Sequence, residues 1–378
     1  MNLPNRGLAI TSTLTTAGAL ELELSDVPIV QPSADEVVVR VDAAPINPSD
    51  LLVLLASADP AEAQFGGSRE RPRVKVPLSP KAFRAMARRI GLRLAIGLEG
   101  AGVVVAAGPN NATLLGNSVA ALTLTGGMFA QYKTVRADEC VVLPDGVDAE
   151  QGAAMFVNPL TALAIVETVR LDDHKALIHT AAASNLGQML VKICREDRVP
   201  LVNIVRKQEH ADRLRALGAQ YVCNSSLPSF RDDLIAAIRE TGATVAFDAL
   251  GGGSMAGEVL AAIEAVADAR ATEYSLYGSF ERKHVYVYGH LDRSDTQLRH
   301  ENYGLVWGVS GWLMPPILAR VGPERTAALR GRVVAQLATT FASHYTRKIT
   351  LAEVLHRDVM LAYCRQATGE KFLITSGV

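Results

Sequence analysis

Short apolar stretches separated by glycine and proline characterise the first 150 residues. Residues 36–41, 102–106 and 118–124 are apolar runs of strand length, and turn-forming residues follow each of them. This pattern predicts a β-rich first domain.

A different pattern, in which strands and helices alternate, occupies residues 156–312. A buried strand is predicted at 176–180, followed by a helix at 186–196 and a second strand at 201–205. The alternation continues with predicted strands at 221–224, 244–250 and 285–288 and predicted helices at 210–217, 232–240 and 255–263. Such alternation is typical of a doubly wound parallel sheet with right-handed crossovers, so the predicted fold class is α/β.

The remaining residues, 313–378, are predicted to return to the first domain. They contain a long helical stretch at 325–341 and a segment of mixed strand and helix character that ends at 371–375. Because the sheet of the second domain is already complete, we predict one domain from residues 1–155 with 313–378, and a second from residues 156–312.

Composition and charge narrow the possible partners. The chain has 378 residues and a formal net charge of −1, so no general attraction to nucleic acid or to a membrane surface is expected. The apolar runs are of strand length and the N-terminal residues lack a signal-peptide pattern, so we expect a cytoplasmic protein without a membrane span. Four cysteines are far apart in the sequence, which predicts buried thiols rather than a local zinc site: Cys140, Cys194, Cys223 and Cys364.

The turn after the predicted strand at 176–180 carries the first candidate site. Residues 180–187 read TAAASNLG, so the glycine positions of the dinucleotide fingerprint become Ala182, Ser184 and Gly187. Small side chains before a helix N-terminus, here begun by Asn185 and Leu186, suit a bound pyrophosphate. We predict a dinucleotide site; the alternative is an ordinary strand–helix turn packed with small residues.

The end of the predicted strand at 201–205 indicates which dinucleotide binds. Arg206 and Lys207 follow this strand. Enzymes that bind NAD usually place an acid there for the ribose 2′-OH, whereas two cations suit the 2′-phosphate of NADPH. Glu209 is expected in the first turn of the next helix, where an acid is favoured anyway. The pattern favours NADPH over a merely solvated basic turn.

Two further loops leave the carboxyl ends of predicted strands and are expected to line the cofactor. One contains Leu250 and Gly251, and the other contains Gly289 and His290. A purely structural role is the alternative for each loop.

Four motifs occur in order along the chain: APINPSD at 44–50, GLEGAG at 97–102, NPLTA at 158–162 and LRALGA at 214–219. Together they resemble the medium-chain dehydrogenase/reductase superfamily. Within it, they are most similar to the quinone oxidoreductase-like branch and to mitochondrial-type trans-2-enoyl thioester reductases. The resemblance implies a GroES-like catalytic domain, a Rossmann domain, an active site in the cleft between them, and a homodimer formed through the edge of the Rossmann sheet.

The resemblance also argues against a catalytic metal. Zinc-dependent relatives have cysteine at the position of Asn47 and histidine at the position of Leu98, and neither an amide nor a leucine replaces those ligands. Without a metal, hydride addition to an already polarised acceptor remains feasible. Asn47 is then the first candidate for a polar group beside the nicotinamide, although an asparagine before proline also shapes turns.

Other site residues follow from the resemblance alone. It places Asn158 and Thr161 near the reactive end of the cofactor, although Asn158 before a proline can also simply start a helix. It places Ser310 at the cofactor, and Trp312 and Tyr132 in the substrate pocket. Trp312 in the core or in a dimer interface is the alternative.

One departure from the similar thioester reductases concerns the proton donor. They carry a tyrosine about ten residues after the position of Asp50, whereas residues 51–67 contain none. The leading hypothesis is therefore an NADPH-dependent reductase of quinones or α,β-unsaturated carbonyl compounds, acting on a small electrophilic acceptor. The alternatives are a trans-2-enoyl-thioester (CoA or acyl-carrier protein) reductase and a non-catalytic NADPH-binding protein.

An unusual insert of 48 residues separates Asp50 from Glu99. Residues 69–93 include nine basic residues and one acid, and Ser79–Pro80 predicts the start of a helix. Four apolar residues are expected on one face of this helix: Phe83, Met86, Ile90 and Leu94. We favour an amphipathic helix packed on the first domain over a basic lid that attracts an anionic substrate.

Overall fold

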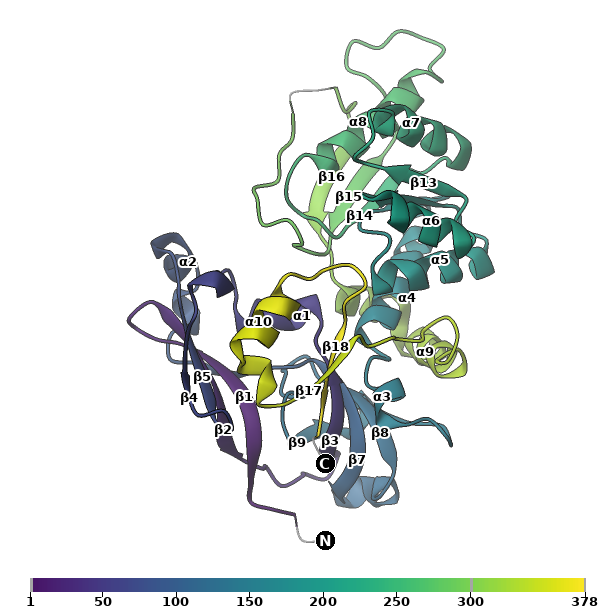
Figure 1. Cartoon of the computed structure of the whole chain (residues 1–378). Coiled ribbons are helices and arrows are strands. Elements are labelled where there is room, and N and C mark those ends of the chain that lie inside the picture. Colours follow the sequence, from purple (N-terminus) through teal and green to yellow (C-terminus); the bar gives the residue numbers. More distant parts are fainter. Residues whose placement is uncertain (1–2, 300–301, 377–378) are drawn as a thin grey trace. The chain divides into compact units, whose positions relative to one another are not determined.

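The computed structural model describes residues 3–299 and 302–376. The chain divides into two compact units, residues 1–157 with 334–378 (the first unit) and residues 158–333 (the second unit), both visible in Figure 1. The C-terminal segment belongs to the first unit because strand β18 (Phe372–Thr375) pairs with strand β3 (Glu36–Pro45).

Two largely antiparallel sheets build the first unit. The first has the strand order β4–β5–β2–β1–β6, and the second has the order β10–β8–β7–β3–β18–β17, with β9 also paired to β3. The further bounds are β1 Arg6–Leu14, β2 Ala19–Pro28, β4 Gln64–Gly67, β5 Pro72–Pro77, β6 Arg93–Ala95, β7 Glu99–Ala107, β8 Ser118–Leu122, β9 Tyr132–Arg136, β10 Cys140–Val142 and β17 Arg347–Thr350. Apolar side chains of both sheets pack into one core. The strands predicted at 36–41, 102–106 and 118–124 correspond to β3, β7 and β8.

Short helices complete the first unit: α1 Pro48–Leu54, α2 Pro80–Ala85, α3 Ala149–Gly152 and α10 Arg357–Cys364. Single 3₁₀ turns lie at 60–62, 87–89, 109–114, 137–139 and 353–355. Helix α1 follows β3 directly, because Pro48 is favoured at the first helical position and Asn47 precedes it with extended backbone. This junction places Asn47 at the end of a buried strand.

The insert adds a hairpin to the edge of the first sheet. Strand β5 pairs with β2 over five residues, from Ala19 opposite Pro77 to Glu23 opposite Arg73. In β5 the valines are buried and the intervening Arg73 and Lys75 are exposed, as the two-residue period of a strand requires. The alternation therefore turns part of the basic charge of the insert toward solvent.

The predicted helix of the insert is present but short. Ser79 caps it as expected, yet α2 ends at Ala85. Leu94 lies in β6 instead, because Gly91 adopts a left-handed conformation (φ +76°) and residues 93–95 then pair with β1. Three of the predicted apolar residues pack against the core of the first unit: Phe83, Met86 and Ile90. This packing favours the amphipathic-helix interpretation of the insert.

A six-stranded parallel sheet forms the second unit, with the order β13–β12–β11–β14–β15–β16. This is the 3-2-1-4-5-6 order of a dinucleotide-binding sheet. The strands are β11 Leu177–His179, β12 Leu201–Val205, β13 Tyr221–Asn224, β14 Val245–Asp248, β15 Lys283–Val287 and β16 Trp307–Gly311. The helices are α4 Val157–Leu171, α5 Asn185–Asp197, α6 Gln208–Ala216, α7 Phe230–Thr241 and α8 Met255–Asp268. The predicted α/β fold is therefore confirmed, and β16, which has glycine at two of its five positions, is an additional strand.

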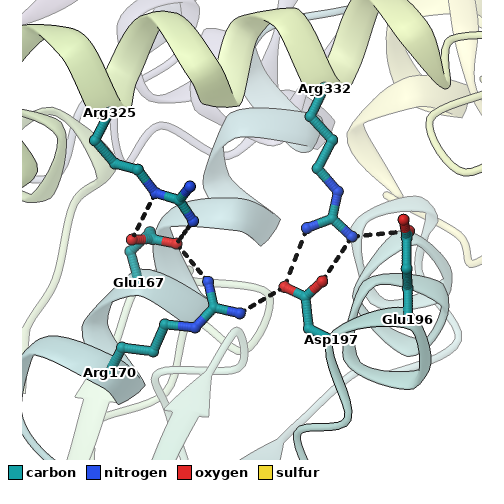
Figure 2. A network of polar contacts seen from close by, with 6 residues as sticks. All are labelled: Glu167, Arg170, Glu196, Asp197, Arg325 and Arg332. Atoms are coloured by element: carbon teal, nitrogen blue, oxygen red, sulfur yellow. Dashed lines mark hydrogen bonds and ion pairs between the residues drawn. The ribbon is translucent and has the colours of Figure 1, made fainter.

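The long helix near the C-terminus differs from its predicted extent. Helix α9 spans Met314–Ala335, with a break at Gly322 (φ +84°), and it ends before the predicted limit at 341. Its second half is held by ion pairs in the second unit, which Figure 2 shows: Arg325 to Glu167 of α4 (2.7 Å) and Arg332 to Asp197 of α5 (2.9 Å). Arg170 joins the two acids, and Arg332 also pairs with Glu196 (2.8 Å). Residues 313–333 therefore group with the second unit, whereas they were predicted in the first domain.

One described helical stretch, 149–171, is long and apolar enough to cross a membrane by length and composition. It combines α3 and α4 and exceeds the strand-length runs expected from the sequence. In its most apolar window, 83 % of the residues are buried inside the protein, which is typical of a core helix.

Candidate functional site

Buried polar side chains meet in the first unit where β3 ends. Asn47, Asp50 and Glu99 are each no more than 2 % exposed. The Asp50 carboxylate accepts hydrogen bonds from the backbone N–H groups of Asn47 (2.8 Å) and Leu98 (2.9 Å), which ties the start of α1 to the segment before β7. Because buried carboxylates are costly without such partners, these bonds hold the cluster together.

Glu99 fixes the amide of Asn47. Its Oε1 accepts a hydrogen bond from Asn47 Nδ2 (2.8 Å), and its Oε2 accepts from the backbone N–H groups of Phe156 (2.9 Å) and Val157 (2.8 Å). A carboxylate can only accept, so the NH₂ group of Asn47 must face it. Asn47 Oδ1 is buried and has no hydrogen-bond partner within the described chain. Asn47 therefore presents an acceptor that a bound molecule could satisfy.

Burial and charge shift the titration of this cluster. Burial raises the pKa of Asp50 to about 7, against its two backbone hydrogen bonds, and it also raises the pKa of Glu99, which Lys371 opposes. Burial lowers the pKa of Lys371 to about 8, and Glu99 and Asp50 oppose that shift. At neutral pH the positive charge of Lys371 therefore interacts with two carboxyl groups, those of Glu99 and Asp50. Asp50 is then close to half protonated.

The raised pKa of Asp50 predicts a pH-dependent stability. Between about pH 4 and pH 7 the folded protein keeps a proton on Asp50 that the unfolded chain releases, so stability falls as pH rises through this window. Asp50→Asn removes the titration. We expect the free energy of unfolding of the wild type, relative to Asp50→Asn, to decrease from pH 4 to pH 7 in urea denaturation. Parallel curves for the two proteins would contradict the shift.

The other predicted residues of the reacting centre are divided between the two units. Asn158 and Thr161 lie three residues apart on the first turn of α4, partly exposed on one face of the second unit. Tyr132 lies on β9 opposite Arg40 of β3. Asn47 is seven residues further along the chain, roughly 20 Å away for an extended strand. Tyr132 and Asn47 therefore lie at different places along β3, and the role of Tyr132 in a substrate pocket stays a prediction.

The predicted dinucleotide turn lies between β11 and α5 in the second unit. Ser184 is the N-cap of α5, and its Oγ accepts a hydrogen bond from the backbone N–H of Gly187 (3.1 Å). Ala182 is fully buried, and its backbone N–H donates to the carbonyl of Ile204 in β12 (3.2 Å). Asn185 and Leu186 begin α5 directly after this cap. The turn thus has the small residues and the helix N-terminus that a pyrophosphate requires.

Gly187 is the residue of this turn with the strictest steric requirement. A Cβ atom there would lie 2.1 Å from the carbonyl oxygen of Ala182, which is backbone and cannot swing away. Gly187→Ala is expected to destabilise the protein by about 1–3 kcal/mol and to weaken dinucleotide binding, because the turn must open. Thermal unfolding and a fluorescence titration measure the two effects. Gly331→Ala is the matched control, because it makes the same change in α9 where an added Cβ would meet no atom within 4 Å.

Asp248 joins the turn to the loop after β14. Its Oδ1 accepts hydrogen bonds from Thr180 Oγ1 (2.6 Å) and from the backbone N–H of Leu250 (3.0 Å), and its Oδ2 accepts from the N–H of Gly251 (3.1 Å). A Cβ on Gly251 would lie 2.5 Å from the carbonyl oxygen of Gly289. The structure therefore brings Leu250 and Gly251 together with the Gly289–His290 loop at the carboxyl edge of the sheet.

A second polar pair at this edge was not found from the sequence. His179, at the end of β11, is fully buried, and its Nε2 lies 2.7 Å from the hydroxyl of Tyr288, just after β15. Burial lowers the pKa of His179 to about 3, so its imidazole is neutral, and burial raises the pKa of Tyr288. The sequence did contain a signal for this pair, because His179 and Tyr288 are polar residues at the ends of two predicted strands.

Arg206 and Lys207 occupy the predicted position directly after β12. Both are exposed; Lys207 Nζ lies 3.3 Å from Glu209 Oε1, and that pair is weak because both groups are solvated. Glu209 falls in the first turn of α6, as predicted. The two cations are therefore available to a phosphate.

Trp312 lies in the interior of the second unit. It is 6 % exposed, its Nε1 donates a hydrogen bond to Thr168 Oγ1 (3.1 Å), and its ring packs edge-on against Phe247. This placement favours the core alternative over a pocket wall. Ser310 is exposed on β16, with its hydroxyl 2.8 Å from His284 Nε2.

Metal ligands do not cluster within residues 3–299 and 302–376: no group of three or more His, Cys, Asp or Glu side chains there is arranged to hold an ion. That the protein works without zinc stays a prediction.

Comparison with known proteins addresses the fold and the family. Residues 33–145 match the alcohol dehydrogenase GroES-like domain. A solved structure titled as a putative NADPH:quinone reductase from Mesorhizobium loti superposes with a TM-score of 0.73 at 23 % identity, covering 99 % of this chain and 100 % of that one. The quinone oxidoreductase of Escherichia coli, solved in complex with NADPH, superposes with a TM-score of 0.66 at 16 % identity, covering 98 % and 99 %. The chain has the medium-chain dehydrogenase/reductase fold. The resemblance predicted from its motifs is thereby confirmed.

Curated relatives match a shorter stretch of the chain. The mitochondrial enoyl-[acyl-carrier-protein] reductase of Xenopus tropicalis is 28 % identical over 209 residues, 53 % of this chain and 51 % of that protein. The chloroplastic quinone-oxidoreductase homolog of Spinacia oleracea is 28 % identical over 220 residues, 56 % and 59 %. The matched region thus spans about half the length of these relatives, which differ from each other in activity.

Proposed function

We propose that the chain is an NADPH-dependent reductase that delivers hydride to an uncharged electrophile, a quinone or an α,β-unsaturated carbonyl compound, without a metal. The observation that carries the proposal is the dinucleotide turn of the second unit with two exposed cations, Arg206 and Lys207, after the neighbouring strand. The names of the solved relatives, which include NADPH:quinone reductases, support the same cofactor and acceptor class.

The residues present fit a dinucleotide phosphate. The close approach of Gly187 to the carbonyl of Ala182 makes the tight turn, and the first turn of α5 supplies backbone N–H donors for the pyrophosphate. Arg206 and Lys207 would hold the 2′-phosphate as two charge-assisted donors. When bound, the nicotinamide supplies the hydride.

Asn47 suits orientation better than charge stabilisation. One N–H of its amide is committed to Glu99, and the atom left without a partner is the acceptor Oδ1. A developing negative charge needs donors, whereas Oδ1 would hold a donor such as a water molecule or a carboxamide. We therefore assign Asn47 to holding a donor in place, a refinement of its expected role beside developing charge.

The enoyl-thioester reductase remains the second candidate because curated relatives of that activity match the chain. The absence of tyrosine at 51–67 weighs against it. Phe65 does not replace that residue, since its ring carries no ionisable proton; it lies 5.9 Å from the guanidinium of Arg357.

Assembly as a homodimer through the second unit stays a proposal. Strand β16 is at the edge of the six-stranded sheet, and three neighbouring apolar side chains are exposed there: Leu305, Val306 and Trp307. Such an edge is suited to pairing with a second copy. A cytoplasmic location likewise stays a prediction.

A titration of the purified protein with NADPH and NADH, followed by fluorescence, tests the proposal first. The preferred cofactor is then offered 1,4-benzoquinone, a panel of enones, and crotonyl-CoA. Tight NADPH binding with turnover of quinone or enone supports the proposal. Turnover of crotonyl-CoA alone promotes the thioester reductase, binding without turnover supports the non-catalytic alternative, and no binding of either cofactor refutes the proposal.

A further inference from the structure

A pocket of about 510 Å³ opens in the first unit between its two sheets. Its lining comes from β1 and β2 on one side and from β3, β17 and β18 on the other, and the insert contributes Arg69 and Glu70 at its mouth. This volume lies within the roughly 300–1,000 Å³ of small-molecule sites. The pocket shares no lining residue with the Asn47 cluster or with the dinucleotide turn.

Small side chains explain why the space is open. Ala43, Ala44, Ala130 and Ala352 all line the pocket, at positions where larger residues would otherwise fill the gap between the sheets. The deeper wall is apolar and rigid, because Met128 and Ile374 belong to the buried core of the unit. A protein interior is normally close-packed, so an apolar recess of this size offers contacts that the chain itself does not supply.

The carboxylates that line the pocket already have hydrogen-bond partners within the protein. Asp42 forms two hydrogen bonds to Arg40 (2.9 and 3.1 Å), and Glu353 accepts from the N–H and hydroxyl of Thr350 (2.7 and 2.9 Å). A hydrogen bond from its own backbone N–H, then one from the Ser68 side chain and the charge of Arg69, hold the pKa of Glu70 below its usual range. His356 Nε2, also in the lining, lies 3.0 Å from the carbonyl oxygen of Arg69. The lining thus offers apolar contact without an uncommitted carboxylate to pair with a cationic ligand.

We propose that this pocket binds an uncharged, largely apolar small molecule with a flat ring, at a site separate from that of the cofactor. An ionised ligand would lose its hydration against the apolar wall. The solvent-exposed guanidinium of Arg69 would return little of that cost to an anion, because exposed ion pairs are weak. A planar neutral molecule would fill the gap between the sheets and displace water from it.

A fluorescence titration with 1-aminoanthracene, which is uncharged at pH 7.5, tests the proposal on the full chain. We expect saturable binding of one molecule per chain, and at least tenfold weaker binding of 1-anthracenecarboxylate. Ala352→Phe places a ring in the pocket and is expected to weaken 1-aminoanthracene at least tenfold. Ala61→Phe, the same change at an exposed position of the first unit, is the control and should leave binding within twofold.

Several outcomes would overturn the proposal. They are non-saturable binding, equal affinity in the wild type and Ala352→Phe, preference for the carboxylate, and displacement of the probe by excess NADPH. The last would place the probe at the cofactor site and leave the proposed reductase function intact. If Ala352→Phe does not fold by thermal unfolding, Ala352→Leu replaces it with an expected loss of about threefold.

Discussion

Glu99→Ala is expected to lower the free energy of unfolding by about 3–5 kcal/mol. Glu99 is fully buried and accepts three hydrogen bonds, from Asn47 Nδ2 and from the backbone N–H groups of Phe156 and Val157. Alanine leaves all three donors without an acceptor, and each buried donor that is left unpaired costs about 1–3 kcal/mol. The relief from burying a charged group offsets part of the sum. Urea denaturation measures the change.

Glu99→Gln separates the stabilising role from the orienting one. The glutamine amide can keep the two backbone donors on its oxygen and donate to Asn47, provided that the Asn47 amide turns over and presents Nδ2 in place of Oδ1. We expect Glu99→Gln to lose less than half as much stability as Glu99→Ala. Its turnover should fall, whereas its affinity for the cofactor should stay unchanged. Glu62→Ala, at an exposed position of the same unit, should change stability by less than about 0.5 kcal/mol. A loss below about 1 kcal/mol for Glu99→Ala would show that the cluster does not support the fold.

Arg206→Glu is expected to shift the affinity ratio of NADPH to NADH toward NADH by about 100-fold. The variant removes a charge-assisted hydrogen bond to the 2′-phosphate, worth about 1.5–3 kcal/mol, and replaces attraction by repulsion. The new carboxylate can also accept from a ribose 2′-OH, which favours NADH. Fluorescence titration with each cofactor gives the ratio.

Arg213→Glu is the matched control for Arg206→Glu. It makes the same charge change on an exposed residue of α6, away from the end of β12. We expect its cofactor ratio to stay within about threefold of the wild type, because an exposed charge that makes no hydrogen bond to the phosphate acts only through solvent and is weakened by salt. An unchanged ratio in Arg206→Glu itself would place the 2′-phosphate elsewhere.

The second unit was largely predictable because its signals are local. Buried parallel strands are short apolar runs, and the small residues of the turn from Ala182 to Gly187 stand directly between such a strand and a helix. Strands β12 and β13 have the bounds expected from the sequence. The position of Arg206 relative to its strand followed from the same local pattern.

The candidate site in the first unit could not be predicted in the same way. Asn47 and Glu99 are 52 residues apart, and the bond between them depends on how β3 pairs with β7. In the second unit, Thr180 and Asp248 are 68 residues apart, and the hydrogen bond between them likewise depends on long-range strand pairing. The break in α9 lies at Gly322, but which unit holds its second half depends on partners such as Glu167. Local periodicity carries no information about such long-range partners.

The hairpin of the insert has a consequence for solubility. Strand β2 is covered on one side by β1 and on the other by β5. A chain shortened between Asp50 and Glu99 to remove residues 64–77 would leave unpaired those backbone N–H and C=O groups of residues 19–23 that face β5, on alternate residues of the strand. An exposed strand edge is a template for intermolecular pairing and aggregation. The insert thus protects the first sheet from self-association, and a truncated variant would need a charged residue or a proline on β2 to remain monodisperse.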